Sequence, residues 1–372
     1  MKKLSFILAV LTVLSLVFTL SSCGPATALD TNGIEYTFDN STGTYVLSDA
    51  SAVTATSVTI PATLEDSPVK IGAGALKTNT TIETLTIEEG VAVEAKGFES
   101  DSIKKIVLPK GFKLEGAVFE NCTALEEVVF PSDITSLPSN LFKGCTSLKS
   151  LVIPEGVEEF GAILEGCTSI ESITLPGTLT TIYGNAFQNV TTLKEVHITD
   201  LKAWCNMNFV DNGALSSGNN PFFTRAALFV DGKQVTDLVI PDGVTEIKPG
   251  VFNGASGIKS VTVPASVKKI GHYAFAGCAD LETVNLTNGL EQIAHNAFAV
   301  TALKTLTIPA SVTYVGENVV VECQDLTNVY FQSTSNWTTW MYSTDTPVSV
   351  SDSQANAELM KSYDNYRYEK KN

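Results

Sequence analysis

The most constraining feature of this 372-residue sequence is a short apolar run that recurs twelve times at a nearly constant spacing. Successive runs end 21–23 residues apart, apart from a first interval of 27 and one of 42 near the middle. The last residues of the runs are Pro61, Glu88, Pro109, Pro131, Pro154, Pro176, Thr199, Pro241, Pro264, Thr287, Pro309 and Gln332. This period is typical of stacked repeats. We therefore expect one elongated stack of about twelve coils, although length alone would suggest two globular domains.

Each repeat contains the parts of one coil. The fullest copies read L-x-x-V-x-I-P-x-x-V-x-x-I-x-x-x-A-F-x-x-C, and the first apolar residues alternate as in a strand. Proline then ends the strand, because it has no N–H to continue the pairing. The second Val and Ile pair and the A-F-x-x-C turn complete the coil. One coil cannot bury its apolar face alone, so the coils are predicted to stack with parallel strands.

Two inward repeat positions are each dominated by one residue type. Phenylalanine is expected to form a continuous aromatic spine at Phe98, Phe119, Phe142, Phe187, Phe252, Phe275 and Phe298. Cysteine recurs at Cys122, Cys145, Cys167, Cys278 and Cys323, where other copies have Val190 and Val300. A position that also accepts valine needs a small apolar group, so buried free thiols are predicted. Disulfides between coils remain the alternative, since an exported protein can keep them.

Two rows of side chains point outward from the strands. The first row alternates Glu and Lys between successive coils, as in Glu83 and Lys104, so unlike charges are neighbours and favour the register. The third outward residue is mostly β-branched. Three consecutive members, Val107, Val129 and Val152, could form an apolar stripe for a partner or could reflect strand propensity alone. His197 occupies the same row and has no predictable acid–base partner, so these four residues are candidates for binding rather than catalysis.

The repeat resembles the leucine-rich repeats of the BspA-like family of bacterial surface proteins. The copies at residues 257–280 and 302–326 match its consensus in period, proline position and the A-F-x-x-C turn, and the resemblance covers about residues 50–332. It implies a leucine-rich-repeat solenoid, mainly β, with parallel stacked strands and short turn or helical segments. It also implies adhesion to host matrix proteins or to other cells.

The first 22 residues are predicted to be a signal peptide. Two lysines precede an almost entirely apolar stretch at residues 4–20. The stretch leads into the sequence LSSC, which resembles the lipobox of bacterial lipoproteins and implies that Cys23 carries the lipid anchor. By resemblance to Gram-negative sorting rules, Gly24 in the next position favours the outer membrane. An ordinary signal peptide followed by a chance cysteine is the alternative.

The remaining chain is expected to consist of a capped stack. Residues 23–50 contain the anchor linker and a hairpin cap, residues 51–332 the solenoid, and residues 333–372 a C-terminal cap. Caps are needed because terminal coils would otherwise expose apolar edges. The long interval indicates an insertion at about residues 200–234, with a short helix capped by Asp200 and an Asp-Gly hairpin.

Aromatic residues outside the regular repeat are further candidates for binding. Trp204, Phe222 and Phe223 lie in the insertion, where they could contact a partner or pack onto the coils. Trp337 and Trp340 lie in the C-terminal cap, where they could bind glycans or only cover the last coil.

Composition and motifs exclude several functional classes. The formal net charge of −16 argues against nucleic-acid binding, which needs basic patches. The sequence has no G-x-S-x-G, H-E-x-x-H or P-loop motif, so we predict no catalytic residues and no cofactor. His272 and His295 share a repeat position, but two histidines without further ligands do not predict a metal site.

These observations favour one function and leave one alternative. We expect an exported, non-enzymatic and monomeric lipoprotein, exposed at the surface of the outer membrane, that binds extracellular proteins. The resemblance implies that the partners are host proteins, such as matrix proteins, or proteins of neighbouring cells. The alternative is a glycan-binding module that uses aromatic residues of the insertion or the C-terminal cap.

Overall fold

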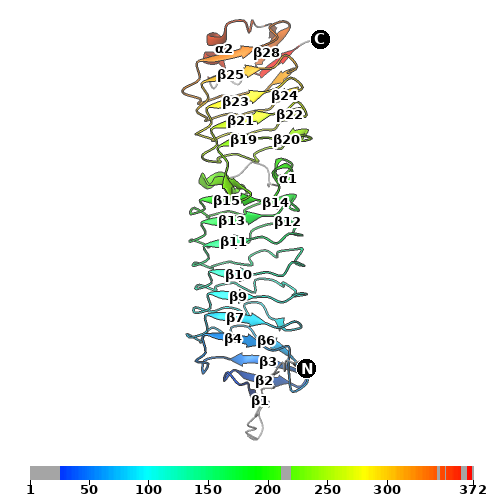
Figure 1. The fold of residues 1–372 in the computed structure, drawn as a ribbon, viewed down its shortest axis with the longest axis vertical. Coiled ribbons are helices and arrows are strands. Elements are labelled where there is room, and N and C mark those ends of the chain that lie inside the picture. Colours follow the sequence, from blue (N-terminus) through cyan, green and yellow to red (C-terminus); the bar gives the residue numbers. More distant parts are fainter. Residues whose placement is uncertain (1–25, 211–218, 342–343, 348, 362–366, 371–372) are drawn as a thin grey trace, which may run out of the picture.

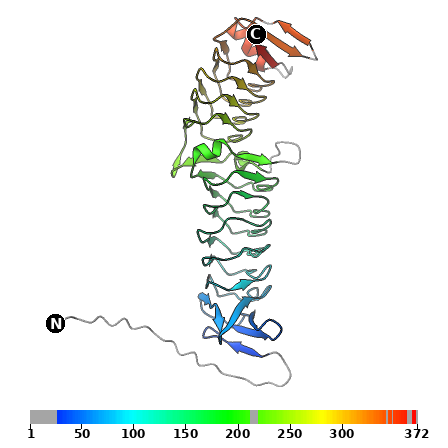
Figure 2. The same ribbon diagram turned by 90° about the vertical axis from the view of Figure 1, so that its right-hand side faces the viewer.

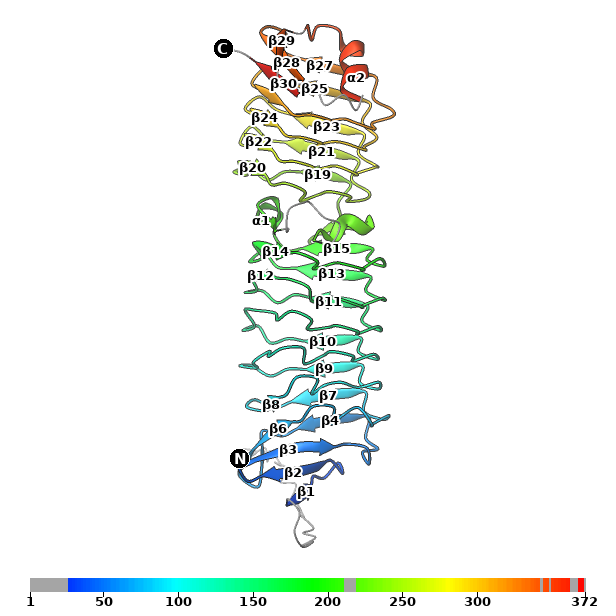
Figure 3. The same ribbon diagram turned by 180° about the vertical axis from the view of Figure 1, so that it is seen from behind.

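The described part of the chain forms one long stack of coils (Figures 1 and 2). The computed structural model describes residues 26–210, 219–341, 344–347, 349–361 and 367–370. Two sets of parallel strands, here called the first and second ladders, run up the stack (Figure 3). The predicted solenoid of stacked parallel strands is confirmed.

The strands of the first ladder correspond to the apolar runs of the sequence. Alternate residues of each run are buried in the core. Ile173 lies opposite Val196, and Val261 lies opposite Val284, so equivalent repeat positions are in register. Pairing is interrupted between β10 and β11, between β17 and β19, and between β23 and β25. The strands are β4 (Ser57–Ile60), β7 (Thr84–Ile87), β9 (Lys105–Val107), β10 (Glu127–Val129), β11 (Ser150–Val152), β13 (Ser172–Leu175), β15 (Glu195–Ile198), β17 (Ala227–Val230), β19 (Asp237–Val239), β21 (Ser260–Val263), β23 (Thr283–Leu286), β25 (Thr305–Ile308) and β27 (Asn328–Phe331).

The second ladder lies on another side of the coils, and apart from β3 and β6 its strands have two or three residues. It is also interrupted, between β8 and β12 and between β16 and β20. The strands are β3 (Thr44–Asp49), β6 (Ser67–Ile71), β8 (Ala92–Val93), β12 (Glu159–Phe160), β14 (Thr181–Tyr183), β16 (Asn208–Val210), β20 (Glu246–Ile247), β22 (Lys269–Ile270), β24 (Gln292–Ile293) and β26 (Tyr314–Val315).

Antiparallel strands cover both ends of the stack. At the N-terminal end, β1 (Thr27–Leu29) and β2 (Glu35–Asp39) extend the sheet from β3, and β5 (Thr63–Leu64) pairs with β6. At the C-terminal end, β30 (Arg367–Lys370) pairs with β26 and β28 (Trp337–Met341), and β28 pairs with β29 (Thr344–Pro347). The helix α2 (Ser353–Lys361) contacts β27, where Asn356 Nδ2 donates to the carbonyl oxygen of Val329 at 3.0 Å. These elements replace the coil that each end lacks.

Ion pairs occur between equivalent positions of neighbouring coils, as the alternating row predicts. Lys104 Nζ lies 2.8 Å from Glu83 Oε1, and Lys194 Nζ lies 2.8 Å from Glu171 Oε1. Lys304 pairs with Glu282 in the same way. Unlike charges at opposed positions of neighbouring strands favour this register, and a coil out of register would lose these contacts.

The aromatic spine is real but not continuous, which corrects the expectation from the sequence. Phe119 stacks on Phe98 and on Phe142 with centroids 5.2 Å apart in both pairs. In the next coil Leu164 takes the spine position, because it lies three residues before the buried Cys167, just as Phe142 lies three residues before Cys145. Leu164 therefore separates Phe142 from Phe187. A second run stacks Phe252, Phe275 and Phe298 at 5.2 and 5.6 Å.

The five repeat cysteines are buried free thiols, as predicted. Each thiol donates to the carbonyl oxygen of a spine residue in the preceding coil. Cys122 Sγ lies 2.8 Å from the oxygen of Phe98, and Cys278 Sγ lies 3.1 Å from that of Phe252. Burial raises the pKa of the Cys278 thiol to about 12. These side chains therefore act as small apolar groups that also join neighbouring coils.

We expect none of the six cysteines in residues 24–372 to react with iodoacetamide at pH 8 in the folded protein. Burial keeps each thiol away from the reagent, and the raised pKa values of Cys205 and Cys278 keep those two protonated. Intact mass after labelling should show no adduct in native buffer and six adducts in guanidinium chloride without reductant. A disulfide between any two coils would reduce the second number to four.

The insertion provides a joint where both ladders are interrupted. The strand β17 pairs with β15 in parallel and with β18 (Lys233–Gln234) in antiparallel orientation through the predicted Asp-Gly hairpin. The helix α1 (Leu201–Cys205) begins at its predicted cap, where Asp200 Oδ1 accepts from the Ala203 amide at 2.9 Å. Beyond the joint, the first ladder resumes at β19 and the second at β20. The amides of Lys248 and Ser256 donate across the joint to the carbonyl oxygens of Cys205 and Ala226.

Two aromatic side chains of the insertion fill the core of this joint. Trp204 is 2% exposed, and its Nε1 donates to the carbonyl oxygen of Val251 at 2.9 Å. Phe222, on the 3-10 helix η1 (Pro221–Thr224), is fully buried and meets Trp204 edge-on at 5.9 Å. The prediction that Trp204 and Phe222 belong to a binding surface is therefore wrong, because they replace the regular strand packing that the insertion removes.

Gly254→Ala is expected to destabilise the joint more than Gly232→Ala. Both glycines have positive φ, at +87° and +72°, so both substitutions impose backbone strain of about 1–2 kcal/mol. Only at Gly254 would the added Cβ meet an atom, the carbonyl oxygen of Phe222 at 2.5 Å. Overpacking adds a further 1–3 kcal/mol or so to the loss of unfolding free energy. Urea unfolding measures both variants, and equal losses would contradict the tight contact.

Candidate binding surface

A row of outward side chains crosses seven strands of the first ladder, with strand pairing interrupted between β10 and β11 and between β17 and β19. We call it the outer stripe and define it as Val107, Val129, Val152, Thr174, His197, Phe229 and Val239. Val129 lies opposite Val107, Thr174 opposite Val152, and His197 opposite Thr174. All point away from the core because each is flanked by inward residues of its strand. The stripe therefore brings together four of the residues predicted from sequence.

The valines of the stripe are unusually open to solvent. Val152 and Val239 are 60% and 61% exposed, and Val129 is 37% exposed. Val107 is only half-buried and marks one end of the row. Contiguous exposed apolar side chains are typical of interaction sites, whereas single ones are not. The arrangement in a row is what makes these valines a candidate surface.

His197 and Phe229 form an aromatic pair within the stripe. Their ring centroids are 4.6 Å apart with planes 27° from parallel, and His197 Nε2 lies 3.0 Å from Glu195 Oε2. The pair exists because β17, a strand of the insertion, joins the ladder beside β15. The sequence predicts a hairpin here but not the pairing of β17 with β15, so Phe229 is not expected in the row. Its alternating sequence ALFV, like that of the repeat strands, was the available signal.

Phe223 is exposed but does not belong to the outer stripe. Its side chain is 58% exposed on η1, in a turn that lies against Gly254 of a neighbouring turn. The structure thus places Phe223 on a turn rather than on the strand face.

The tryptophans of the C-terminal cap contribute less to a surface than predicted. Trp337 is 3% exposed, donates from Nε1 to the carbonyl oxygen of Ser333 at 2.7 Å, and meets Phe331 edge-on at 5.0 Å. The prediction that Trp337 is available for binding is wrong, because the ring covers the last coil. The backbone of Trp340 lies in β28, and its side chain lies outside the described part of the chain.

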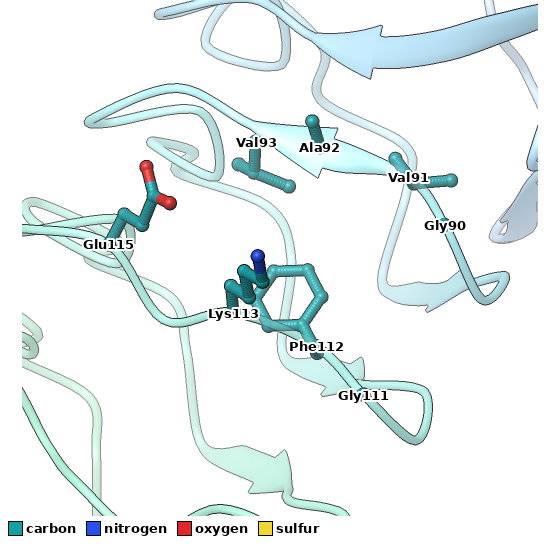
Figure 4. Close-up of a pocket in the computed structure, with 8 residues that line it drawn as sticks. All are labelled: Gly90, Val91, Ala92, Val93, Gly111, Phe112, Lys113 and Glu115. Atoms are coloured by element: carbon teal, nitrogen blue, oxygen red, sulfur yellow. The ribbon is translucent and has the colours of Figure 1, made fainter.

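A cavity of about 300 Å³ lies away from the stripe, between β8 and the next coil (Figure 4). The apolar wall includes Val91, Val93 and Phe112, and Phe112 also stacks on Phe98 at 6.3 Å. Among its lining residues only Lys113 and Glu115 carry charge. None of the residues predicted to bind a partner lines it. The outer stripe therefore remains the surface where those predictions converge.

Other predicted sites can be placed more briefly. The rings of His272 and His295 stack at 5.1 Å, and within the described residues no group of three or more His, Cys, Asp or Glu side chains is arranged to hold a metal ion. The helices in the described ranges are too short and polar to cross a bilayer. The signal peptide and Cys23 lie outside the described residues.

Three solved structures of bacterial proteins are similar to this chain. A leucine-rich cell surface protein from Faecalibacterium prausnitzii is 21% identical, with 85% of this chain and 97% of that chain covered and a TM-score of 0.37. The pneumococcal vaccine antigen PcpA is also 21% identical, with 84% and 83% covered and a TM-score of 0.45. A leucine-rich repeat protein from Bacteroides ovatus is 24% identical, with 80% and 86% covered and a TM-score of 0.41.

The family comparison is more direct. No curated protein sequence matches this chain. The family model for the BspA type leucine-rich repeat region matches residues 50–163, 91–216 and 225–345, which together include most of the chain. These ranges contain the coils and the spine that the structure shows. The chain belongs to the BspA-type leucine-rich repeat family.

Proposed function

We propose that this protein binds other proteins through the outer stripe and has no enzymatic role. The observation that carries this proposal is the outward row in which the exposed Val129, Val152 and Val239 accompany the half-buried rings of His197 and Phe229. Solenoids present extended surfaces suited to large partners. A surface already ordered by backbone pairing loses little conformational entropy when a partner binds. The aromatic pair of His197 and Phe229 provides an anchor near the middle of the surface.

The position of the protein in the cell is part of the same proposal. Cleavage before Cys23 and acylation of that cysteine would anchor the chain to the bacterial envelope, at the outer membrane and facing outward. More than one acyl chain gives stable anchoring, at about 0.8 kcal/mol for each buried methylene. Host proteins and proteins of neighbouring cells would then be accessible partners for a monomeric adhesin.

The burial of two tryptophans weakens the glycan alternative. Aromatic glycan contacts need an exposed ring face, whereas Trp204 and Trp337 are 2% and 3% exposed and donate their indole N–H groups to backbone carbonyls. Trp204 and Trp337 would have to leave the core before they could bind a glycan, whereas protein binding through the stripe needs no rearrangement.

Val152→Asn should reduce capture of extracellular partners about tenfold, which corresponds to about 1.4 kcal/mol. The substitution replaces an exposed apolar group with a polar one that the ladder accepts, since Asn285 occupies the equivalent position in another coil. Immobilised residues 24–372 would be incubated with extracellular host and community proteins, and bound proteins quantified by mass spectrometry.

The matched control for Val152→Asn is Thr307→Asn, at the same repeat position outside the stripe. Thr307→Asn should capture the same proteins as the unmodified chain, and circular dichroism should show that both variants fold. Equal capture by all three proteins would refute binding through the outer stripe.

Cys23→Ala should abolish acylation of the full-length protein. The variant keeps the apolar signal segment but lacks the thiol that would be acylated. Metabolic labelling with an alkynyl fatty acid should mark the unmodified protein and leave the variant unmarked. External protease on intact cells should degrade the anchored protein. Labelling of both proteins alike would refute Cys23 as the anchor, and full protection from protease would refute surface exposure.

A further inference from the structure

We infer that the partner of the outer stripe is a basic amphipathic helix of another protein. This inference rests on the proposed function and specifies the chemistry of the partner. It is based on the carboxylates that flank the stripe and on the spacing of its rungs.

Carboxylates recur at two fixed offsets from the stripe residues. Three lie two residues before a member and share its outward face, and three lie three residues after a member, in the following turn. We call these six the flanking acids: Glu127, Glu195 and Asp237 before, and Glu155, Asp200 and Asp242 after. The same two offsets also hold Lys105 and Lys110, both beside Val107, but from Val129 to Val239 every charged residue at these offsets is acidic.

The flanking acids are largely uncompensated by basic side chains. Among the described residues, Glu127 pairs with Lys105 at 2.9 Å, and Glu195 Oε2 lies 3.0 Å from Nε2 of His197, which is itself a stripe member. Glu155 Oε1 accepts from the hydroxyl of Thr199 at 2.8 Å. Asp200 caps α1, and Asp237 Oδ1 accepts from the hydroxyl of Ser260.

Three acids of the alternating row, by contrast, are paired. Glu83, Glu171 and Glu282 each pair with a lysine of the next coil. Hydrogen bonds from the hydroxyls of Ser260 and Thr236 hold the pKa of Asp237 below its usual range, so that group is ionised at neutral pH. The excess negative charge is thus concentrated beside the apolar row. An approaching surface with lysines and arginines on both sides of an apolar strip would complement it.

The rung spacing favours a helix over an extended segment. Hydrogen-bonded neighbouring rungs are about 4.8 Å apart, so the four rungs from Val152 to Phe229, which pair without interruption, span roughly 14 Å. A helix lying along the stripe places one apolar side chain per turn, about every 5.4 Å, so about three turns would cover this length. An extended strand presents same-face side chains only every 6.6 Å or so, which matches the rungs poorly.

Three synthetic 21-residue peptides would test this inference directly on residues 24–372. The first is a helix-forming peptide with leucine once per turn and lysines on both sides, the second replaces the lysines by glutamates, and the third replaces the leucines by serines. Fluorescence anisotropy at 50 and 300 mM salt measures binding. We expect only the first peptide to bind, with affinity at least tenfold weaker at the higher salt concentration.

A matched pair of double variants tests the flanking acids. Glu155→Gln with Asp242→Asn should weaken binding of the first peptide 5- to 20-fold. Glu89→Gln with Asp325→Asn removes the same charge and should have little effect; Glu89 is three residues after Thr86, outside the stripe. Equal effects of the two pairs, binding of the glutamate peptide or binding of no peptide would each overturn the inference.

The proposed function can fail or survive separately from this inference. If Val152→Asn abolishes capture of a natural partner whose binding is insensitive to salt and to the Glu155 and Asp242 pair, the stripe binds proteins but not a basic helix. If Val152→Asn changes nothing, the proposed function itself is refuted.

Discussion

Burial of the apolar face of each coil against the next coil is the interaction on which the whole structure depends. A single coil of 22 or 23 residues has almost no interior of its own, so every buried side chain needs a neighbour above or below. Stacked phenylalanines such as Phe119 and Phe142 provide that contact along each run of the spine. Thiol hydrogen bonds such as that from Cys145 to the Phe119 carbonyl join the same coils. The antiparallel caps are required for the same reason, because the end coils have a neighbour on one side only.

The insertion shows how the stack tolerates irregularity. Backbone pairing is directional and stops at the joint, where β17 pairs with β15 but not with β19. Apolar burial is not directional, so the core continues through the joint on Trp204 and Phe222. A few backbone hydrogen bonds, such as that from Ser256 to Ala226, then place the next coil. The joint therefore preserves the core while it interrupts the hydrogen-bonded ladders.

The outer stripe follows from the register that the core imposes. When inward residues of neighbouring strands are aligned, outward residues are aligned as well, and Val152, Thr174 and His197 fall into one row without any interaction of their own. Paired lysines and glutamates elsewhere keep that register. A binding surface built in this way is rigid before a partner arrives, and its shape and charge can change without altering the core.

The sequence by itself determined the coil period, the parallel register, the alternating ion pairs and the buried thiols, because each depends on positions that recur in every repeat. It could not decide which insertion aromatics are exposed. Trp204 and Phe223 lie in the same insertion, yet Trp204 is buried and donates to the carbonyl oxygen of Val251, 47 residues away, while Phe223 remains open. Nor could it place Phe229 in the stripe, since that required β17 to pair with β15. Periodicity is a local property of the chain, whereas burial at an irregular position depends on which distant segment arrives beside it, and only the tertiary structure decides that.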